Sequence, residues 1–174
     1  MKLISQKSAF SKLDNIRTEF RATIRDGYEH RAKSCVTCET PGACCLDAHF
    51  VNVRISRLEA ESIKAALLEL PLEEQKAAAK RTADCIETYK LDECLETESA
   101  TYACPLFEKG TGCLVHSTAK PLPCIEHACY GSRSELPPDE LLETAERRVY
   151  DLNLRTFGQP GTLIPIPIAI STQD

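Results

Sequence analysis

The sequence lacks two features that would assign it to a nucleic-acid-binding or membrane protein. It has no basic stripe, and 21 lysine and arginine residues against 26 aspartate and glutamate residues give a net charge of −5 and a pI near 5.5. A nucleic acid or an anionic membrane surface is therefore not expected as a partner. No apolar run is long enough for a signal peptide or a transmembrane helix. We therefore expect a cytoplasmic protein.

The sequence also lacks the common signatures of enzymes. It contains no glycine-rich nucleotide loop, and no Ser/His/Asp or paired-carboxylate arrangement can be identified. These absences argue against an enzyme that carries its own nucleotide cofactor. Whether the chain is an enzyme at all is left open by the sequence.

What the sequence has in excess is cysteine, with ten residues in a chain of 174. Eight of them form two blocks about 60 residues apart: Cys35, Cys38, Cys44 and Cys45, then Cys104, Cys113, Cys124 and Cys129. A soft metal ion or an iron–sulfur cluster needs several thiolates that converge on one centre. In a reducing compartment such clusters indicate metal, and disulfide or redox pairing is the alternative. We predict that these eight residues are metal ligands.

The spacing within each block leaves the metal and the number of centres open. Cys35-x-x-Cys38 is typical of a metal knuckle, although thioredoxin-like redox pairs share it when they open a helix after a strand. The adjacent side chains of Cys44 and Cys45 diverge, so binding to two centres is easier than binding to one. The second block matches neither a zinc ribbon nor a ferredoxin. Zinc and an iron–sulfur cluster both remain.

Other residues near the blocks have weaker assignments. We expect Cys85 and Cys94 to be buried small hydrophobic residues, with Cys94 as the first reserve ligand. His127 could bind the metal, but Cys129 is favoured because its sulfur matches the rest of the set. Four cations within four residues of a cysteine either lower thiol pKa values or are ordinary surface charges. They are Lys33, Lys109, Lys120 and Arg133. His49 and His116 are expected to be structural or to donate hydrogen bonds to ligands.

Hydrophobic periodicity and capping signals predict four helices. Their expected ranges are the first thirty residues, Ser56 to Pro71 with a capping box at Ser56 and Glu59, Leu72 to Lys90, and a helix from Pro137–Pro138 to Gly158. The first helix could instead bind a partner or a second copy.

The rest of the chain is predicted to be loop or extended. Residues 50–55 alternate like a short strand, and both cysteine blocks contain turn residues, so we expect loops there. The Ile/Pro tail from Leu163 to Ile170 is expected to be extended along the domain as an edge strand. A partner site on this tail is the alternative.

These elements predict a small α-dominated α+β domain, with several helices around irregular cysteine-rich loops and little strand. We expect three parts: an N-terminal amphipathic helix at 1–34, a cysteine-cluster domain at 35–130, and a C-terminal helix and tail at 131–174 packed on the same domain. The predicted metal site ties residues 35–45 to residues 104–129.

The two blocks together resemble a known family, the YkgJ-like CxxCxxCC cysteine-cluster proteins, which are described as zinc- or iron-chelating domains. The resemblance covers residues 35–130 and rests on Cys35-x2-Cys38-x5-Cys44-Cys45, the capped helix at Ser56, Cys104-Pro-Leu-Phe, Gly112-Cys113-Leu-Val-His and Lys120-Pro-Leu-Pro-Cys124. It implies a chelated zinc ion or an iron–sulfur cluster. Flagellin lysine N-methylases carry a similar cysteine domain, but methyl transfer does not carry over, because the nucleotide loop is missing.

Two function classes follow. The first is a structural or binding module in which thiolates hold zinc or a cluster and the surface recognises a protein partner. The second is an iron–sulfur enzyme or electron carrier that acts on a protein side chain in a methylase-like way. Metal storage or delivery ranks below both, since it requires labile binding. The oligomeric state is not predicted.

Overall fold

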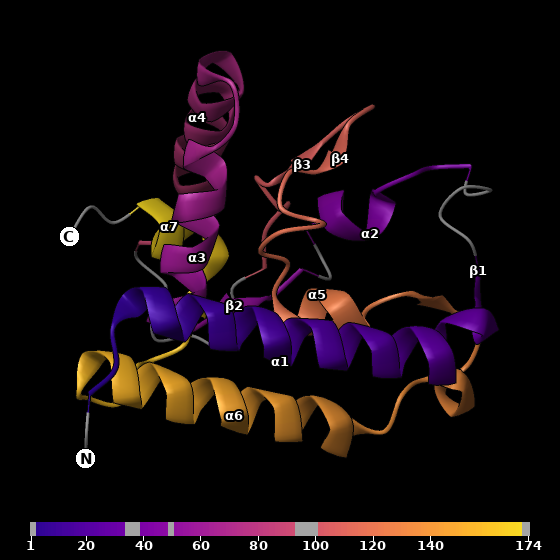
Figure 1. Ribbon diagram of the computed structural model, residues 1–174. Helices are drawn as coiled ribbons and strands as arrows, with labels where there is room; N and C mark the ends of the chain where they lie inside the picture. Colours follow the sequence, from indigo (N-terminus) through magenta and orange to yellow (C-terminus); the bar gives the residue numbers. More distant parts are fainter. Residues whose placement is uncertain (1–2, 34–38, 49–50, 93–100, 172–174) are drawn as a thin grey trace. The chain divides into compact units, whose positions relative to one another are not determined.

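A computed structural model describes residues 3–33, 39–48, 51–92 and 101–171 of the chain. Its described part is mainly helical with a few two-residue strands (Figure 1), which confirms the predicted α-dominated fold class. The α-helices are α1 (Gln6–Gly27), α2 (Ala43–Leu46), α3 (Arg57–Leu68), α4 (Leu72–Tyr89), α5 (Leu122–Glu126), α6 (Asp139–Phe157) and α7 (Ile166–Ser171). The described residues also form the 3-10 helices η1 (Glu29–Arg31) and η3 (Arg133–Glu135).

Within the described ranges, six short strands form three antiparallel pairs. They are β1 (Ala32–Lys33) with β5 (Cys129–Tyr130), β2 (Arg54–Ile55) with β6 (Ile164–Pro165), and β3 (Phe107–Glu108) with β4 (Gly112–Cys113). Each pair joins segments of chain without building an extended sheet. The strands therefore only link neighbouring segments, and the packing of helices forms most of the hydrophobic core.

The chain forms two compact units, each assembled from two separate stretches of sequence. Unit 1 comprises residues 1–41 and 120–161, and unit 2 comprises residues 42–119 and 162–174. This grouping differs from the three consecutive segments expected from the sequence, because the segment 35–130 is divided between both units. The physical reason is that helices distant in sequence bury their apolar faces against each other.

Unit 1 is built on α1 and α6, which lie side by side and run in opposite directions (Figure 1). The backbone N–H of Ile4 donates to the carbonyl of Arg155 at 3.0 Å, and Arg148 contacts Glu19 at 2.7 Å. The short helix α5 packs against both long helices. Their shared core consists of Ala9, Leu13, Ile16, Phe20, Ile24, Leu122, Ile125, Ala145, Val149 and Leu152.

The ends of the two long helices follow local sequence signals. The hydroxyl of Ser5 accepts a hydrogen bond from the N–H of Ser8 and caps the start of α1. Helix α6 begins after Pro138 and ends at Gly158, whose φ of 77° is readily adopted only by glycine. Both helices were expected from periodicity and capping, and both predictions are confirmed.

Unit 2 has its own core, formed by α3, α4, α7 and the segments between them. Helix α3 begins with the predicted capping box, in which Ser56 and Glu59 satisfy each other's backbone N–H groups. Tyr102 is fully buried and its hydroxyl donates to the carbonyl of Val53 while accepting from the N–H of Ile166. The core residues are Val51, Ile55, Ala60, Ile63, Cys85, Leu91, Tyr102, Leu106, Val115, Ala119, Ile166, Ile168 and Ala169.

The prediction of an extended C-terminal tail is wrong for most of its length. Only Ile164–Pro165 is extended, as β6 against β2, and α7 then begins at Ile166. Proline is tolerated in the first turn of a helix, because the N–H groups there have no partner within the helix. Pro167 stands in this first turn, and Ile166, Ile168 and Ala169 are buried in the core of unit 2.

None of the described helices is both long enough and apolar enough to span a membrane.

Candidate metal centre

The first cysteine block is more ordered than the loop expected from its turn residues. Gly42 adopts a φ of 82° and serves as the N-cap of the single-turn helix α2, which carries Cys44 and Cys45. The N–H groups of Cys45 and Leu46 donate to the carbonyl of Gly42 at 2.9 and 3.0 Å. The expectation of loop is therefore wrong for this pair. Cys35 and Cys38 lie outside the described residues.

The second cysteine block contains a hairpin, where irregular chain was expected. Strands β3 and β4 place Phe107 opposite Cys113, and the N–H of Leu114 donates to the carbonyl of Leu106 at 2.9 Å. Gly110 and Gly112 have φ values of 89° and 98°, which the tight turn between the strands requires. The hairpin fixes Cys113 beside the chain that begins at Cys104.

Two contacts hold these blocks together within unit 2. The N–H of Cys104 donates to the carbonyl of Cys45 at 2.7 Å. A Cβ atom added to Gly42 would lie 1.8 Å from Cζ of Phe107, so the ring packs directly on the glycine backbone. Only glycine fits at this position, because both the φ value and the ring exclude a side chain.

The result is a group of four thiols from two distant segments, which we call the unit 2 thiol group: Cys44, Cys45, Cys104 and Cys113. The Cys45 sulfur is close enough to the other three for their charges to interact with it. Burial is the main reason that the pKa of Cys45 rises to about 12, followed by the negative charges of Cys44, Cys104 and Cys113. With this pKa the Cys45 thiol stays protonated near neutral pH.

The Cys104 sulfur also receives hydrogen bonds from the backbone N–H groups of Leu106 and Phe107. These bonds favour the thiolate, although burial still raises the pKa of Cys104 to about 11. Two N–H donors directed at one sulfur from the turn that follows it are a preformed environment for a negatively charged ligand.

Cys85 lies next to this group on α4. Its side chain is buried, as predicted, and its thiol donates to the carbonyl of Ala103. Burial raises the pKa of Cys85 to about 12, with a smaller effect of the charge on Cys104. This environment fits the predicted role as a buried small hydrophobic residue. Cys94 and His49 lie outside the described residues.

The last two predicted ligands belong to unit 1. Cys124 lies in α5, and Cys129 lies on β5, where it is paired with Lys33 of β1. Between them, the pKa of His127 is lowered first by burial and then by the charge on Lys120. His116 is exposed and follows the hairpin in unit 2, where its N–H donates to the carbonyl of Cys113 at 3.0 Å.

The donor chemistry of the unit 2 thiol group fits a soft metal, since all four side chains offer sulfur and thiolates prefer zinc and iron. Their arrangement is not yet a coordination shell. Among the residues that the structure describes, no three His, Cys, Asp or Glu side chains are positioned to hold one ion.

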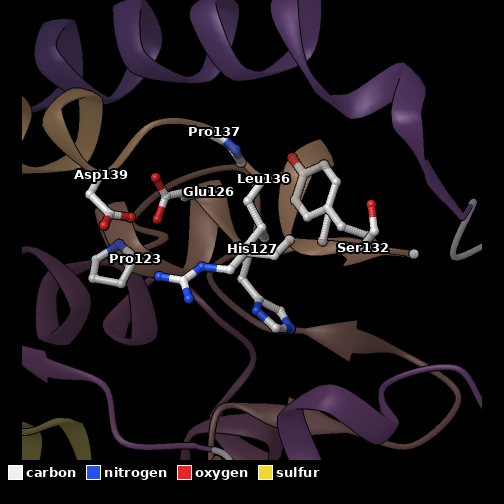
Figure 2. Close-up of a pocket in the computed structure, with 11 residues that line it drawn as sticks. Pro123, Glu126, His127, Ser132, Leu136, Pro137 and Asp139 are labelled. Carbon is white, nitrogen blue, oxygen red and sulfur yellow. The ribbon is translucent and has the colours of Figure 1, made fainter.

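A cleft in unit 1 was not anticipated from the sequence. It has a volume of about 500 Å³ and lies between α5 and the start of α6 (Figure 2). Glu126 and Asp139 place their carboxyl groups side by side at one end of it. Burial, then the charges of Asp139 and Glu146, raise the pKa of Glu126 to about 7. The pairing of Glu126 with Asp139 had no sequence signal, because their proximity depends on the path of the chain between them, which includes η3.

Comparison with protein-family models, with curated proteins and with solved structures finds no match to this chain. The resemblance to the YkgJ-like proteins therefore stays a prediction from the cysteine motif.

Proposed function

We propose that this protein binds zinc or an iron–sulfur cluster through clustered cysteine thiolates and acts as a structural or binding module. The observation that carries the proposal is the unit 2 thiol group, in which two segments about 60 residues apart bring Cys44, Cys45, Cys104 and Cys113 together. A protein core rarely concentrates thiols without a chemical use for them.

The local backbone supports a metal-ligating role for these residues. A knuckle needs a tight turn and N–H groups directed at the sulfur, and Cys104 has both. Several thiolates close together repel each other, and a bound cation removes that repulsion. When bound, the metal would cross-link the two segments and add its binding free energy to the stability of unit 2.

The remaining members of the predicted ligand set are Cys35, Cys38, Cys124 and Cys129. The resemblance to the YkgJ-like family supports them, since both cysteine blocks occur in the family's order. The alternative function, an iron–sulfur enzyme or electron carrier that acts on a protein side chain, uses the same ligands. The identity of the metal separates the two proposals.

The test is elemental analysis and an absorption spectrum of the full chain purified without oxygen. Stoichiometric zinc and a colourless protein favour the structural module. Iron and sulfide with a broad band near about 400 nm favour the cluster and therefore the enzyme or electron carrier. A protein without bound metal, and without affinity for added zinc or iron, overturns the proposal.

Variants test the ligand assignment. Cys45→Ser and Cys104→Ser are expected to lower the metal content by at least about half, because each removes a thiolate from the group. Cys85→Ala is the matched control, since it removes a neighbouring thiol that is buried against Ala103. It should keep the metal content of the unmodified protein. Equal metal content in all three variants would show that the unit 2 thiol group is not the site.

A further inference from the structure

We propose that the cleft of unit 1 binds a small organic cation, an ammonium or guanidinium group, through the carboxyl groups of Glu126 and Asp139 and the hydroxyl of Tyr130. This inference uses no residue of the unit 2 thiol group and does not depend on metal binding.

The cleft has the size of a small-molecule site. Its volume of about 500 Å³ falls within the range that ligand pockets usually have. Pro123, Leu136 and Pro137 supply apolar wall, and Leu136 is 47% exposed although it is a large aliphatic residue. An alkyl chain of a few carbons could cover this surface. Polar side chains also line the cleft and can orient a ligand. They are Glu126, His127, Tyr130, Ser132, Arg133 and Asp139.

Two oxygen atoms in the cleft wall have unmet hydrogen-bonding capacity. Oε1 of Glu126 and the hydroxyl oxygen of Tyr130 are inaccessible to solvent and have no hydrogen-bond partner among the described residues. A buried polar atom without a partner destabilises a protein, so each such atom needs an explanation. A ligand that carries several N–H donors on one positive nitrogen group would satisfy both atoms after a small side-chain movement.

The charges in the cleft favour a cation. Glu126 lies near the negative charges of Asp139 and Glu146, and the hydroxyl of Tyr130 lies near Glu126. Arg133 also lines the cleft, but no ion pair joins it to Glu126 or Asp139 within the described part of the chain. The two carboxyl groups therefore keep their capacity for an external cation. Arg133 in turn offers a contact to a ligand that also carries a carboxylate.

A metal ion is a poorer occupant than an organic cation. A hard divalent ion needs six or more oxygen ligands in a compact shell. No three acidic or histidine side chains in the described ranges are arranged in that way. An ordered water molecule is the remaining competitor, since it too could donate to Glu126 and Tyr130.

The experiment is a titration of the full chain, followed by backbone amide chemical shifts, at about pH 8 so that Glu126 is ionised. The probes are propylamine and agmatine, with 4-aminobutyrate and arginine as their carboxylate-bearing counterparts. Saturable shifts at residues 126–133 with either amine support the proposal. Tighter binding of the carboxylate-bearing probe identifies a zwitterionic ligand held by Arg133 as well. Shifts that do not saturate with any probe overturn it and leave water as the occupant.

Two variants separate binding from structure. Glu126→Gln should weaken amine binding by at least about tenfold, because a charge-assisted hydrogen bond is lost. Glu143→Gln removes the same charge from an exposed position on α6 and should change the affinity by less than about twofold.

Tyr130→Phe removes one oxygen atom that has no partner in the described protein. The ligand-free variant should melt at the same or a higher temperature than the unmodified protein, while the stabilisation by bound amine becomes smaller. A lower melting temperature together with unchanged amine stabilisation would show that a water molecule, and no ligand, uses this hydroxyl.

Discussion

Unit 1 and the cysteine-bearing segments of unit 2 differ in how much regular secondary structure they contain. In unit 1 the long helices α1 and α6 bury continuous apolar stripes against each other and against α5. In unit 2 the described segments that carry the thiol group contain only one helical turn, α2, and one hairpin, whose two strands are two residues long each. The thiol-bearing part thus has much less regular structure than the part built on long helices.

This difference indicates where a metal would matter. Helix packing of the unit 1 type is stable without a ligand, because apolar burial supplies the free energy. Short irregular segments gain less from burial, and a metal site can provide the missing cross-link. We therefore expect the cysteine segments of unit 2 to depend on metal and the long helices of unit 1 not to depend on it.

The largest expected effect follows from removing the metal with a chelator. Amide hydrogen exchange should rise by at least about 100-fold at residues 42–48 and 101–115, because the cross-link is lost. Exchange within α1 and α6 should stay within about threefold of its original rate. Exchange measured by mass spectrometry on both states checks this. Equal acceleration in both units would contradict the proposed difference between them.

The second prediction concerns a substitution that removes part of the core of unit 1. Phe20 is 6% exposed on the inner face of α1, and Phe20→Ala should cost about 3–5 kcal/mol in the free energy of unfolding. Tyr150→Ala on α6 is the control, since that ring is 45% exposed and should cost about 1 kcal/mol or less. Urea unfolding measures both. Metal content should be unchanged in both variants, and loss of metal in Phe20→Ala would show that the units are coupled.

The third prediction concerns the contact between Gly42 and Phe107. Gly42→Ala should destabilise unit 2 by about 3 kcal/mol, because alanine is strained at this φ and its Cβ would overlap the ring. It should also weaken metal binding, since α2 moves relative to the hairpin. Gly110→Ala has a similar positive φ but nothing within 4 Å of the added Cβ, so it isolates the backbone term at about 1–2 kcal/mol. Calorimetry and metal titration measure both variants. If the two substitutions have equal effects on stability and on metal affinity, the contact with the ring is not the cause of the destabilisation.

The smallest expected effect is the pH dependence from Glu126. Its pKa is raised from 4.5 to about 7 in the folded protein, so the folded state binds a proton that the unfolded state releases. This contribution is full below pH 4.5 and is lost as the pH rises through about 7. Because solvent screens a half-exposed carboxyl, the loss is on the order of 1 kcal/mol. The free energy of unfolding is measured on both sides of this window. The difference between the unmodified protein and Glu126→Gln should change by this amount, since His127 titrates in both proteins and cancels.

The helices of unit 1 and the capping box of α3 could be predicted because their signals are local. Ser56 and Glu59 lie three residues apart, and Gly158 directly follows the last apolar position of α6. Such signals determine where a helix begins or ends, whatever the helix packs against.

The tail and the cysteine segments could not be predicted in the same way. Proline in the tail excludes a helix interior but allows a first turn, and only burial of Ile166 and Ile168 in the core of unit 2 selects the helix. The single turn at Cys44 depends on Gly42, whose conformation is fixed by the ring of Phe107 from a distant segment. Neither interaction produces a periodic pattern in the sequence from which it could be predicted.

The sequence by itself determined the start of α3, the end of α6, the fold class and the chemistry of the sulfur donors, since these depend on residue type and short spacing. Tertiary structure decided which cysteines meet. It brought Cys44, Cys45, Cys104 and Cys113 into one thiol group and assigned Cys124 and Cys129 to the other unit. It also formed the cleft at Glu126 and Asp139. Proximity between distant residues follows from the packing of whole elements, which no local pattern encodes.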